Sequence, residues 1–403
     1  MKKKDLYIFT DSFPFGLGET YVANEISEYY QNFNKIFLIP INLTGTQRYM
    51  PANCEVINIH EHAAFSSFNF VKAFPLLCVY FLKELSVTFH KWVYLKNFSN
   101  AIKILYNALV YAKALKSIAK KTDENNAAFY TYWFYHWALV CSLAKKNKYI
   151  PAYISRAHLG DLYEIKSKLV FTNLKLQSIN HLYVISNHGK QFFENNYPKY
   201  IQKISVHYLG SPKVTTHDHK EVCNKFLIVS CSSVKPIKRV DEIYQVVCNL
   251  QFPVKWVHFG GGGEGFEKLK QLVLTKPGNV DIELKGHVPN TELLKFYETH
   301  QIDLFINLST TEGLPVSIME AQSFGIPVLA TDVFATNEAV VKGTGMLVDN
   351  KASVKEIALS VVEIKRQIEN KEISNLFILN HWNTHFNAHT NYLKFAEQLN
   401  KDE

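Results

Sequence analysis

The sequence lacks the features that mark a membrane-spanning or secreted protein. No window of about twenty uninterrupted apolar residues is present. The apolar run that follows the N-terminal lysines, Leu6 to Phe9, is too short for a signal peptide and ends at Asp11. The six cysteines show no CxxC pattern and no close spacing, which argues against a disulfide scaffold. We therefore expect a soluble chain in the reducing cytoplasm.

Arginine is also scarce, because only four of the 44 basic residues are arginines. No recognised nucleic-acid motif accompanies the lysines, so we expect no nucleic-acid partner. Residues 1–210 hold 24 Lys and Arg against 13 Asp and Glu (+11), whereas residues 211–403 hold 20 against 23 (−3), which together give +8. A basic first half favours an anionic partner, such as the inner face of the cytoplasmic membrane or a phosphorylated acceptor. Lysines spread over solvated faces are the alternative.

Short β-branched and aromatic segments alternate with helical segments, which predicts an α/β protein with two Rossmann-like domains. The strands expected in the first half are residues 5–10, 35–40, 55–59, 128–133, 151–156, 182–186 and 204–210. Those expected in the second half are residues 226–231, 254–259, 281–288, 303–308, 327–331 and 343–348. The domain boundaries expected from this pattern are 1–210 and 225–380, with a polar linker at 211–224 and a C-terminal helix at 381–403.

A long helical tract is expected between the third and fourth strands, at about residues 67–121. Aromatic side chains in this tract alternate with lysines. That pattern suits an amphipathic helix at a membrane interface. It equally suits helices packed on the sheet with lysines at the rim, and the sequence leaves both interpretations open.

Two features of the first half lie where parallel sheets place ligands, at the carboxyl ends of strands. Gly16 and Gly18 follow the first strand, and His158 follows the fifth, with Arg156 and Asp161 close by in sequence. A glycine loop allows close approach of the backbone to a ligand, but it is also an ordinary strand–helix turn. His158 is either a site residue or a structural histidine.

The second half is organised around two glutamates, Glu312 and Glu320, between two buried strand patterns. Pro315 suits the first turn of a helix and Gly325 its end, so Glu312 precedes this helix and Glu320 lies within it. A helix N-terminus suits a phosphate, and a nearby carboxylate can accept two hydrogen bonds from a ribose diol. The arrangement predicts a site for a nucleotide sugar.

Two further loops of the second half carry site candidates. Lys235, Lys238 and Arg239 crowd the loop before the helix at about residue 240, and cations there suit a diphosphate. The run Gly260 to Gly265 satisfies GxGxxG, the fingerprint of dinucleotide binding, so an NAD-dependent enzyme has to be considered. The run follows the second strand of its half rather than the first, which counts against that function.

Taken together, these motifs resemble the retaining glycosyltransferases of family 4, the group 1 glycosyl transferases with the GT-B fold. The resemblance rests on the segment Glu312 to Pro315 with Glu320, on Lys238 in KPIKRVD, on the glycines at 260–262 and on LKGHV at 284–288. It implies two Rossmann-like domains that face each other across a cleft, an N-terminal acceptor-binding domain and a C-terminal nucleotide-sugar-binding domain. The C-terminal helix is expected to pack back on the N-terminal domain.

The resemblance also implies roles for individual residues. Catalysis would fall to Lys238 at the diphosphate, Glu312 at the donor sugar and His158 at the hydroxyls of the reacting sugar. Glu320 would hold the ribose of the donor. The other donor-binding positions would be Gly16, Gly18, Arg239, Gly261, His287, Val288, Gly313, Leu314 and Pro315. The family usually has Gly-Arg where this chain has Ser232-Ser233, so the phosphate role of that arginine would pass to Arg239 or Lys235.

The resemblance implies transfer of a hexose-type sugar, with retention, from a UDP- or GDP-sugar to a glycan or lipid-linked acceptor of a bacterial surface polysaccharide. No cofactor is expected, and no metal site, since no Asp-x-Asp motif of the metal-chelating type occurs. Two alternatives stay open: a sugar-nucleotide epimerase of the same fold, and a non-catalytic subunit that binds a nucleotide sugar.

Overall fold

The structure is a computed structural model that describes residues 3–16, 18–88, 91–119, 126–163, 170–212 and 220–401. The chain divides into two compact units: unit 1 contains residues 1–207 and 392–403, and unit 2 contains residues 208–391. Residues 213–219 of the expected linker lie outside the described residues. Residues 381–391, which we expected in the returning helix, belong to unit 2.

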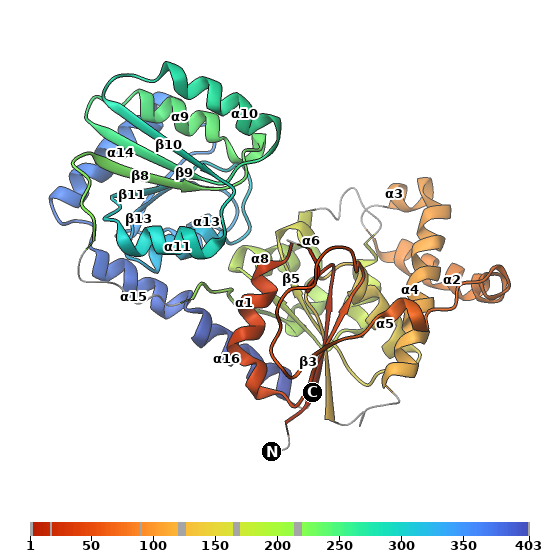
Figure 1. The fold of residues 1–403 in the computed structure, drawn as a ribbon. Helices are drawn as coiled ribbons and strands as arrows, with labels where there is room; N and C mark the ends of the chain where they lie inside the picture. The colour runs from red at the N-terminus through yellow and green to blue at the C-terminus, as the bar shows by residue number, and fades with distance from the viewer. Residues whose placement is uncertain are drawn as a thin grey trace. The chain divides into compact units, whose positions relative to one another are not determined.

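Unit 1 is built on a parallel sheet of seven strands in its described residues, in the order β3-β2-β1-β4-β5-β6-β7 (Figure 1). The strands are β1 (Asp5–Thr10), β2 (Ile36–Pro40), β3 (Cys54–Val56), β4 (Ala127–Thr131), β5 (Ile154–Ala157), β6 (His181–Val184) and β7 (Ile204–Val206). Its main helices are α1 (Thr20–Tyr29), α2 (Ser67–Val87), α3 (Lys91–Lys96), α4 (Phe98–Ala119), α5 (His136–Lys146), α6 (Leu159–Tyr163), α7 (Thr172–Ser178) and α8 (Asn187–Asn196).

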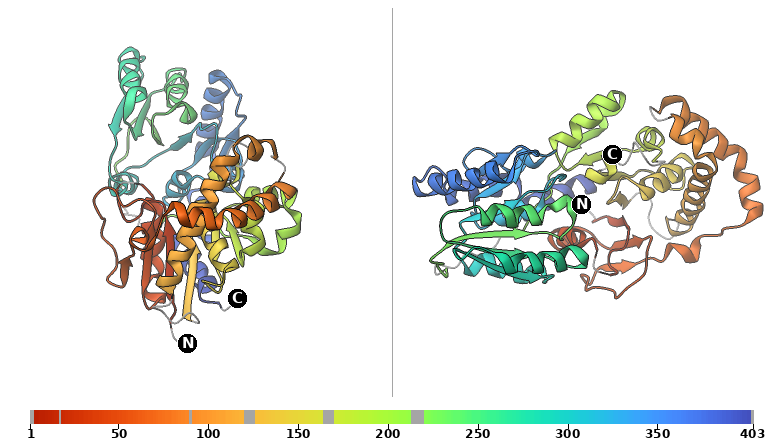
Figure 2. Two further views of the ribbon diagram at one scale, coloured as in Figure 1. Left: turned by 90° about the vertical axis from the view of Figure 1, so that its right-hand side faces the viewer. Right: turned by 90° about the horizontal axis from the view of Figure 1, so that it is seen from above.

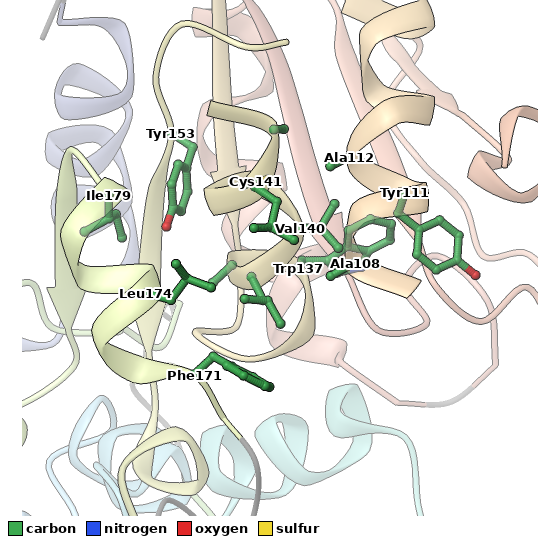
Figure 3. Packing of buried hydrophobic residues seen from close by; sticks show 14 of the residues in the cluster. Ala108, Tyr111, Ala112, Trp137, Val140, Cys141, Tyr153, Phe171, Leu174 and Ile179 are labelled. Atoms are coloured by element: carbon green, nitrogen blue, oxygen red, sulfur yellow. The ribbon is translucent and has the colours of Figure 1, made fainter. Parts of the chain in front are cut away.

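Two expectations for unit 1 are corrected by the structure. The third strand ends at Val56 rather than at residue 59, because the Asn58 side chain accepts a hydrogen bond from the amide of His60 and a 3₁₀ turn, Ile59–His62, follows. The helical tract is not continuous, since α2, α3 and α4 are separate helices. The core of the unit lies where α4 and α5 pack together, and there Ala108, Tyr111 and Ala112 lie close to Trp137 and Val140 (Figure 3).

Unit 2 is built on a second parallel sheet, with the order β10-β9-β8-β11-β12-β13. The strands are β8 (Phe226–Cys231), β9 (Val254–Phe259), β10 (Val280–Gly286), β11 (Leu304–Asn307), β12 (Val328–Thr331) and β13 (Gly345–Val348). The helices are α9 (Val240–Cys248), α10 (Gly263–Leu272), α11 (Asn290–Thr299), α12 (Val316–Gln322), α13 (Thr336–Ala339), α14 (Val354–Glu369) and α15 (Asn375–His385). After β8, the chain adds β9 and β10 on one side of it and then β11, β12 and β13 on the other side.

Three helix ends of unit 2 lie at glycine or proline residues. α10 begins at Gly263, so part of the glycine run is helical. α11 has Pro289 at its N-cap, and Asn290 is its first residue. α12 ends as expected, because Gly325 adopts a left-handed conformation (φ +72°) and donates to the carbonyl of Gln322 at 3.0 Å.

The last helix, α16 (Ala388–Asn400), carries the chain back into unit 1, which confirms that the C-terminal helix packs on the N-terminal domain. The Arg156 guanidinium lies over the ring of Phe395 in this helix, with 4.0 Å between its Cζ atom and the ring centroid. Arg156 also forms a buried ion pair with Glu25 of α1. In the chain before it, α15 stays in unit 2, where Trp382 donates to the Ser211 hydroxyl at 2.8 Å.

Candidate functional site

The sheet of unit 2 changes direction between β8 and β11, and open α/β sheets bind ligands at this point, beyond the carboxyl ends of the strands. The loop after β8 brings Lys238 to this position, and the loop after β11 brings Glu312. Their side chains form an ion pair with 2.5 Å between Lys238 Nζ and Glu312 Oε1. Both are partly exposed, at 22% and 14% of their side-chain surface, so the pair is accessible to a ligand.

Neighbouring groups hold this ion pair in place. Asn307 Nδ2 donates to Glu312 Oε1 at 3.3 Å. The Asn307 side chain is itself held in place, because its Oδ1 accepts a hydrogen bond from the backbone amide of Ser309 at 3.0 Å. The amide of Thr310 donates to the carbonyl of Ile237 at 2.9 Å, which ties the two loops together. The carboxylate and the ammonium are therefore positioned by both loops before any ligand binds.

Glu320 lies on α12, among the buried residues of that helix, and is only 7% exposed. Burial raises the pKa of its carboxyl to about 7, and a hydrogen bond from Asn290 partly opposes this. Asn290 Nδ2, at the start of α11, donates to Glu320 Oε1 at 2.9 Å. Cys231 is the last residue of β8. Burial raises the pKa of its thiol to about 12, and the charge of the nearby Glu320 adds to this rise. A buried carboxylate with few donors is suited to accept hydrogen bonds from a ligand.

Backbone amides at the start of α12 complete this part of the site. Among the described residues, no acceptor contacts the amides of Gly313, Leu314, Val316 and Ser317. Pro315 occupies the N-cap position, one residue before the first turn, and has no N–H to satisfy. Leu314 and Pro315 are buried, so the loop has a fixed course between Glu312 and the helix.

Arg239 has structural partners in the part of the chain that the structure describes. Its Nε donates to the carbonyl of Leu308 at 2.5 Å, and its Nη1 and Nη2 donate to the carbonyl and side-chain oxygens of Asn350 at 2.9 and 3.2 Å. The residue is 9% exposed and forms an ion pair with Glu242 at 3.4 Å. Lys235, in contrast, is exposed. The guanidinium therefore holds the loop after β11 in place.

The glycine run after β9 serves close packing between loops. A Cβ on Gly260 would lie 1.9 Å from the carbonyl oxygen of Ser232, and its φ of +116° favours glycine. The amide of Gly260 donates to the carbonyl of Gly286 at 2.7 Å, which joins the loop that contains Gly261 to the loop that contains His287 and Val288. Backbone packing thus accounts for glycine at position 260 without a dinucleotide.

In unit 1, His158 follows β5 as expected, and aromatic side chains surround its imidazole ring. Its ring is stacked on the Tyr132 ring, with 5.1 Å between the two ring centroids. The centroid of the Trp133 ring lies 4.4 Å from that of His158. Burial and the charge of Arg156 lower the pKa of His158 to about 3, so the imidazole is neutral. Asp161 accepts a hydrogen bond from the His158 amide at 2.8 Å. The His158 Nε2 atom is buried without a hydrogen-bond partner in the described residues, so its hydrogen-bonding capacity is not used within them.

The loop of Gly16 and Gly18 is organised by Glu19. The Glu19 carboxylate accepts from the amides of Ser12 and Phe13, both at 2.7 Å, and from Trp133 Nε1 at 2.6 Å. Gly16 has a positive φ of +66°, and Arg48 donates to the carbonyl of Gly18. Leu17 lies outside the described residues. Glu19 thereby connects this loop to the aromatic surround of His158 through Trp133.

Residues 215–375 match the family described as "Glycosyl transferases group 1". The matched stretch contains every element of the site in unit 2. Within the matched residues the chain is similar to the group 1 glycosyl transferases. The O-antigen biosynthesis glycosyltransferase WbnH of Escherichia coli is 39% identical to this chain over 139 residues, which are 34% of this chain and 37% of that protein. The chain thus aligns with little more than a third of the length of this relative.

Solved structures extend the likeness in fold to nearly the whole chain. A lipopolysaccharide outer core galactosyltransferase, WaaB, gives a TM-score of 0.64 at 15% identity, over 98% of this chain and 99% of that one. Anabaena HepE in complex with UDP gives 0.65 at 15% identity, with the same coverage. At this identity the likeness establishes the fold alone, and that fold is GT-B.

Several residues that shape the site carry no signal of this role in the sequence. An asparagine at the start of a helix usually caps it, whereas the Asn290 side chain is bonded to Glu320. Asn307 and Trp133 read as ordinary strand residues, and only the structure shows their contacts with Glu312 and Glu19. Within the described ranges, no cluster of three or more His, Cys, Asp or Glu side chains could hold a metal ion. None of the helices described is long and apolar enough to cross a membrane.

Proposed function

We propose that the chain transfers a hexose-type sugar from a nucleoside diphosphate sugar to a hydroxyl of a glycan or lipid-linked acceptor, with retention of configuration. The observation that carries the proposal is the Lys238–Glu312 ion pair at the switch point of the unit 2 sheet, together with the buried Glu320 of the same unit. The combination offers a cation for phosphate and two carboxylates for hydroxyl groups within one family-matched unit.

Each group of the site has a part of the donor to bind. Glu320, oriented by Asn290, accepts hydrogen bonds from the ribose hydroxyls. Glu312 and the amides of Gly313 and Leu314 contact the donor sugar. The loop after β10, at His287 and Val288, contacts the base. The family match and the unpaired amides at the start of α12 support this assignment.

The chemistry follows from the charges that develop as the sugar–phosphate bond breaks. The departing diphosphate gains negative charge, and Lys238 is the cation placed to stabilise it. Contact with phosphate requires the Lys238 ammonium to share or leave Glu312, which frees that carboxylate to accept a hydroxyl of the sugar. The exposed Lys235 supplies a second cation, while Arg239 keeps the loop in place. Because cationic side chains supply the stabilising charge, we propose that transfer is independent of a metal.

His158 is the corresponding group of unit 1. Because its imidazole is neutral and its Nε2 lacks a partner in the described part of the chain, it can accept a hydrogen bond from a sugar hydroxyl. Gly16 and Gly18, held by Glu19, border the donor phosphates and the acceptor. The proposal gives unit 1 the acceptor and unit 2 the donor.

The names of similar proteins guide the choice of substrates. One relative is named for O-antigen biosynthesis, one solved structure for the lipopolysaccharide outer core, and another contains UDP. We therefore propose UDP as the first donor nucleotide to test, GDP as the second, and a bacterial surface glycan as the acceptor. The described cysteines are all free thiols, which fits a reducing cytoplasmic location.

A thermal-shift screen of UDP-, GDP-, ADP- and CMP-sugars tests the proposal, because a ligand that binds the native state raises the midpoint of unfolding. We expect one nucleotide class to raise the midpoint of the wild-type chain but not that of Glu320→Gln. Glu267→Gln, a change at an exposed glutamate of α10, is the matched control and should behave as the wild type. A screen in which no sugar nucleotide shifts the midpoint would contradict the proposal.

Turnover of the stabilising donor separates the two alternatives. A transferase releases nucleoside diphosphate only when a glycan acceptor is present, and NMR of the product should show the anomeric configuration of the donor. An epimerase would convert the donor sugar without an acceptor. A non-catalytic subunit would bind the donor and convert nothing.

A further inference from the structure

The outer face of α2 is apolar, although it does not face the core. The helix buries Leu77, Tyr80 and Phe81 on one side, against α4. Its opposite side carries Phe68, Val71, Val79 and Leu82 at helical spacing, and these side chains are 45–69% exposed. A helix on the surface of a water-soluble domain normally places polar residues there.

The apolar surface continues beyond α2. We define the α2–α3 ridge as the exposed large apolar side chains from residue 65 to residue 98: Phe65, Phe68, Val71, Phe74, Leu76, Val79, Leu82, Val87, Trp92, Leu95 and Phe98. These eleven are more than half of the 21 exposed large apolar side chains in the described residues. Trp92 is 77% exposed. Figures 1 and 2 show α2 and α3 on the outer side of unit 1, away from its sheet.

The charges on the ridge are of one sign. Lys72, Lys83, Lys91 and Lys96 are exposed along α2 and α3. The one acidic residue of these two helices, Glu84, is buried and accepts hydrogen bonds from the amides of α7, including that of Leu174 at 2.8 Å. No exposed carboxylate therefore offsets the lysines on these helices.

We propose that the α2–α3 ridge docks on an anionic lipid surface, with its aromatic and aliphatic side chains in the interface and its lysines at the headgroups. Lysines beside exposed aromatic residues have this arrangement in interfacial helices. Because none of the described helices can span a bilayer, the contact is peripheral. The inference concerns a surface of unit 1 and does not depend on the donor site of unit 2.

Charge complementarity decides between a lipid surface and a second copy of the chain. A symmetric contact between two ridges would bring the lysines of both copies together, with no exposed carboxylate of α2 or α3 to compensate them. An anionic bilayer supplies the opposite charge and an apolar interior at once. Each lysine at such a surface strengthens binding by about fivefold, an effect that salt screens.

Sedimentation of the full chain with vesicles tests the proposal, using neutral phosphatidylcholine vesicles and vesicles that also contain phosphatidylglycerol. We expect binding to the anionic vesicles that weakens with added salt. Val71→Ser/Leu82→Ser should weaken it at least tenfold, and Lys72→Gln/Lys83→Gln by roughly 25-fold at low salt. Leu274→Ser/Leu359→Ser changes equally exposed apolar residues of unit 2 and should bind as the wild type. Unchanged thermal midpoints would show that the variants fold.

Fluorescence of Trp92 gives an independent readout, because Trp137, Trp256 and Trp382 are buried and Trp133 is half-buried, whereas Trp92 is exposed. Anionic vesicles should shift the emission of the wild type to the blue, and brominated lipids should quench it. Trp92→Phe should lose most of this signal while it still sediments with vesicles.

The proposal is overturned if the wild type does not bind anionic vesicles, or if the ridge and control variants bind equally. Concentration-dependent self-association that Val71→Ser/Leu82→Ser abolishes, without vesicle binding, would instead make the ridge an interface between copies. UDP binding, measured separately, tests the proposed function.

Discussion

Replacing Glu320 by glutamine should change how the stability of the protein depends on pH. The Glu320 carboxyl is 7% exposed, and burial raises its pKa from 4.5 to about 7. The folded state therefore binds a proton more tightly than the unfolded state between these two values. Stability contributed by Glu320 must then fall as the pH rises from 4.5 to 7 and stay constant above 7.

The size of the effect follows from the two pKa values. One pKa unit corresponds to about 1.36 kcal/mol, so a rise from 4.5 to about 7 corresponds to about 3 kcal/mol in all. Between pH 5 and pH 8 the wild type should lose about 2.5 kcal/mol of unfolding free energy through this one group. Glutamine fills nearly the same volume but does not titrate, so Glu320→Gln should not show this loss.

Urea unfolding of both proteins at pH 5, 6, 7 and 8 measures this quantity. The difference between wild type and Glu320→Gln isolates Glu320, because other buried groups such as Asp161 titrate in both proteins. We expect the variant to become more stable relative to the wild type as the pH rises. If the two stability curves run parallel from pH 5 to pH 8, Glu320 is not a buried carboxylate with a raised pKa, and its assignment to the ribose loses its physical basis.

Three further perturbations follow from the same contacts. Lys238→Met should lower kcat by roughly 100- to 1000-fold and change donor affinity by less, because the charge on the leaving group develops only during the reaction; an unchanged rate of nucleotide release would contradict this. Asn290→Ala should weaken nucleotide binding by about 1 kcal/mol and raise the pKa of Glu320, as calorimetry at pH 6 and pH 8 would show. Arg156→Met should destabilise unit 1 by about 3–5 kcal/mol, because it leaves Glu25 buried without a cation. Adding Glu25→Gln should restore most of the thermal midpoint.

The central strands of both sheets were predictable from the sequence because they are largely buried on both faces. Continuous apolar runs such as Phe226 to Cys231 leave a strand in a parallel sheet as the simplest interpretation, and β8 has those bounds. The long helical tract was less predictable. Its aromatic residues fit both the core and the surface interpretation, and the structure contains both, with Phe81 buried and Phe68 exposed on one helix.

The main features of the site could also be predicted, but not its supporting contacts. Glu312 and Lys238 were identified from motifs, whereas their ion pair joins loops 74 residues apart. Asn290 is the first residue of α11, and an asparagine at a helix start usually serves as a cap. Whether its side chain turns to its own helix or to Glu320 depends on tertiary packing, which no local pattern encodes. Arg239 was expected at the phosphate for its charge, yet it bonds to Leu308 and Asn350.

The most direct test of the central claim is amide hydrogen exchange, followed by mass spectrometry, with and without a saturating concentration of UDP. Binding at the proposed site should protect peptides that cover residues 232–239 and 310–322, because the amides of Gly313, Leu314, Val316 and Ser317 have no acceptor in the described residues. Peptides from α2 and α3 should exchange at unchanged rates. UDP binding without protection of either loop would contradict the account.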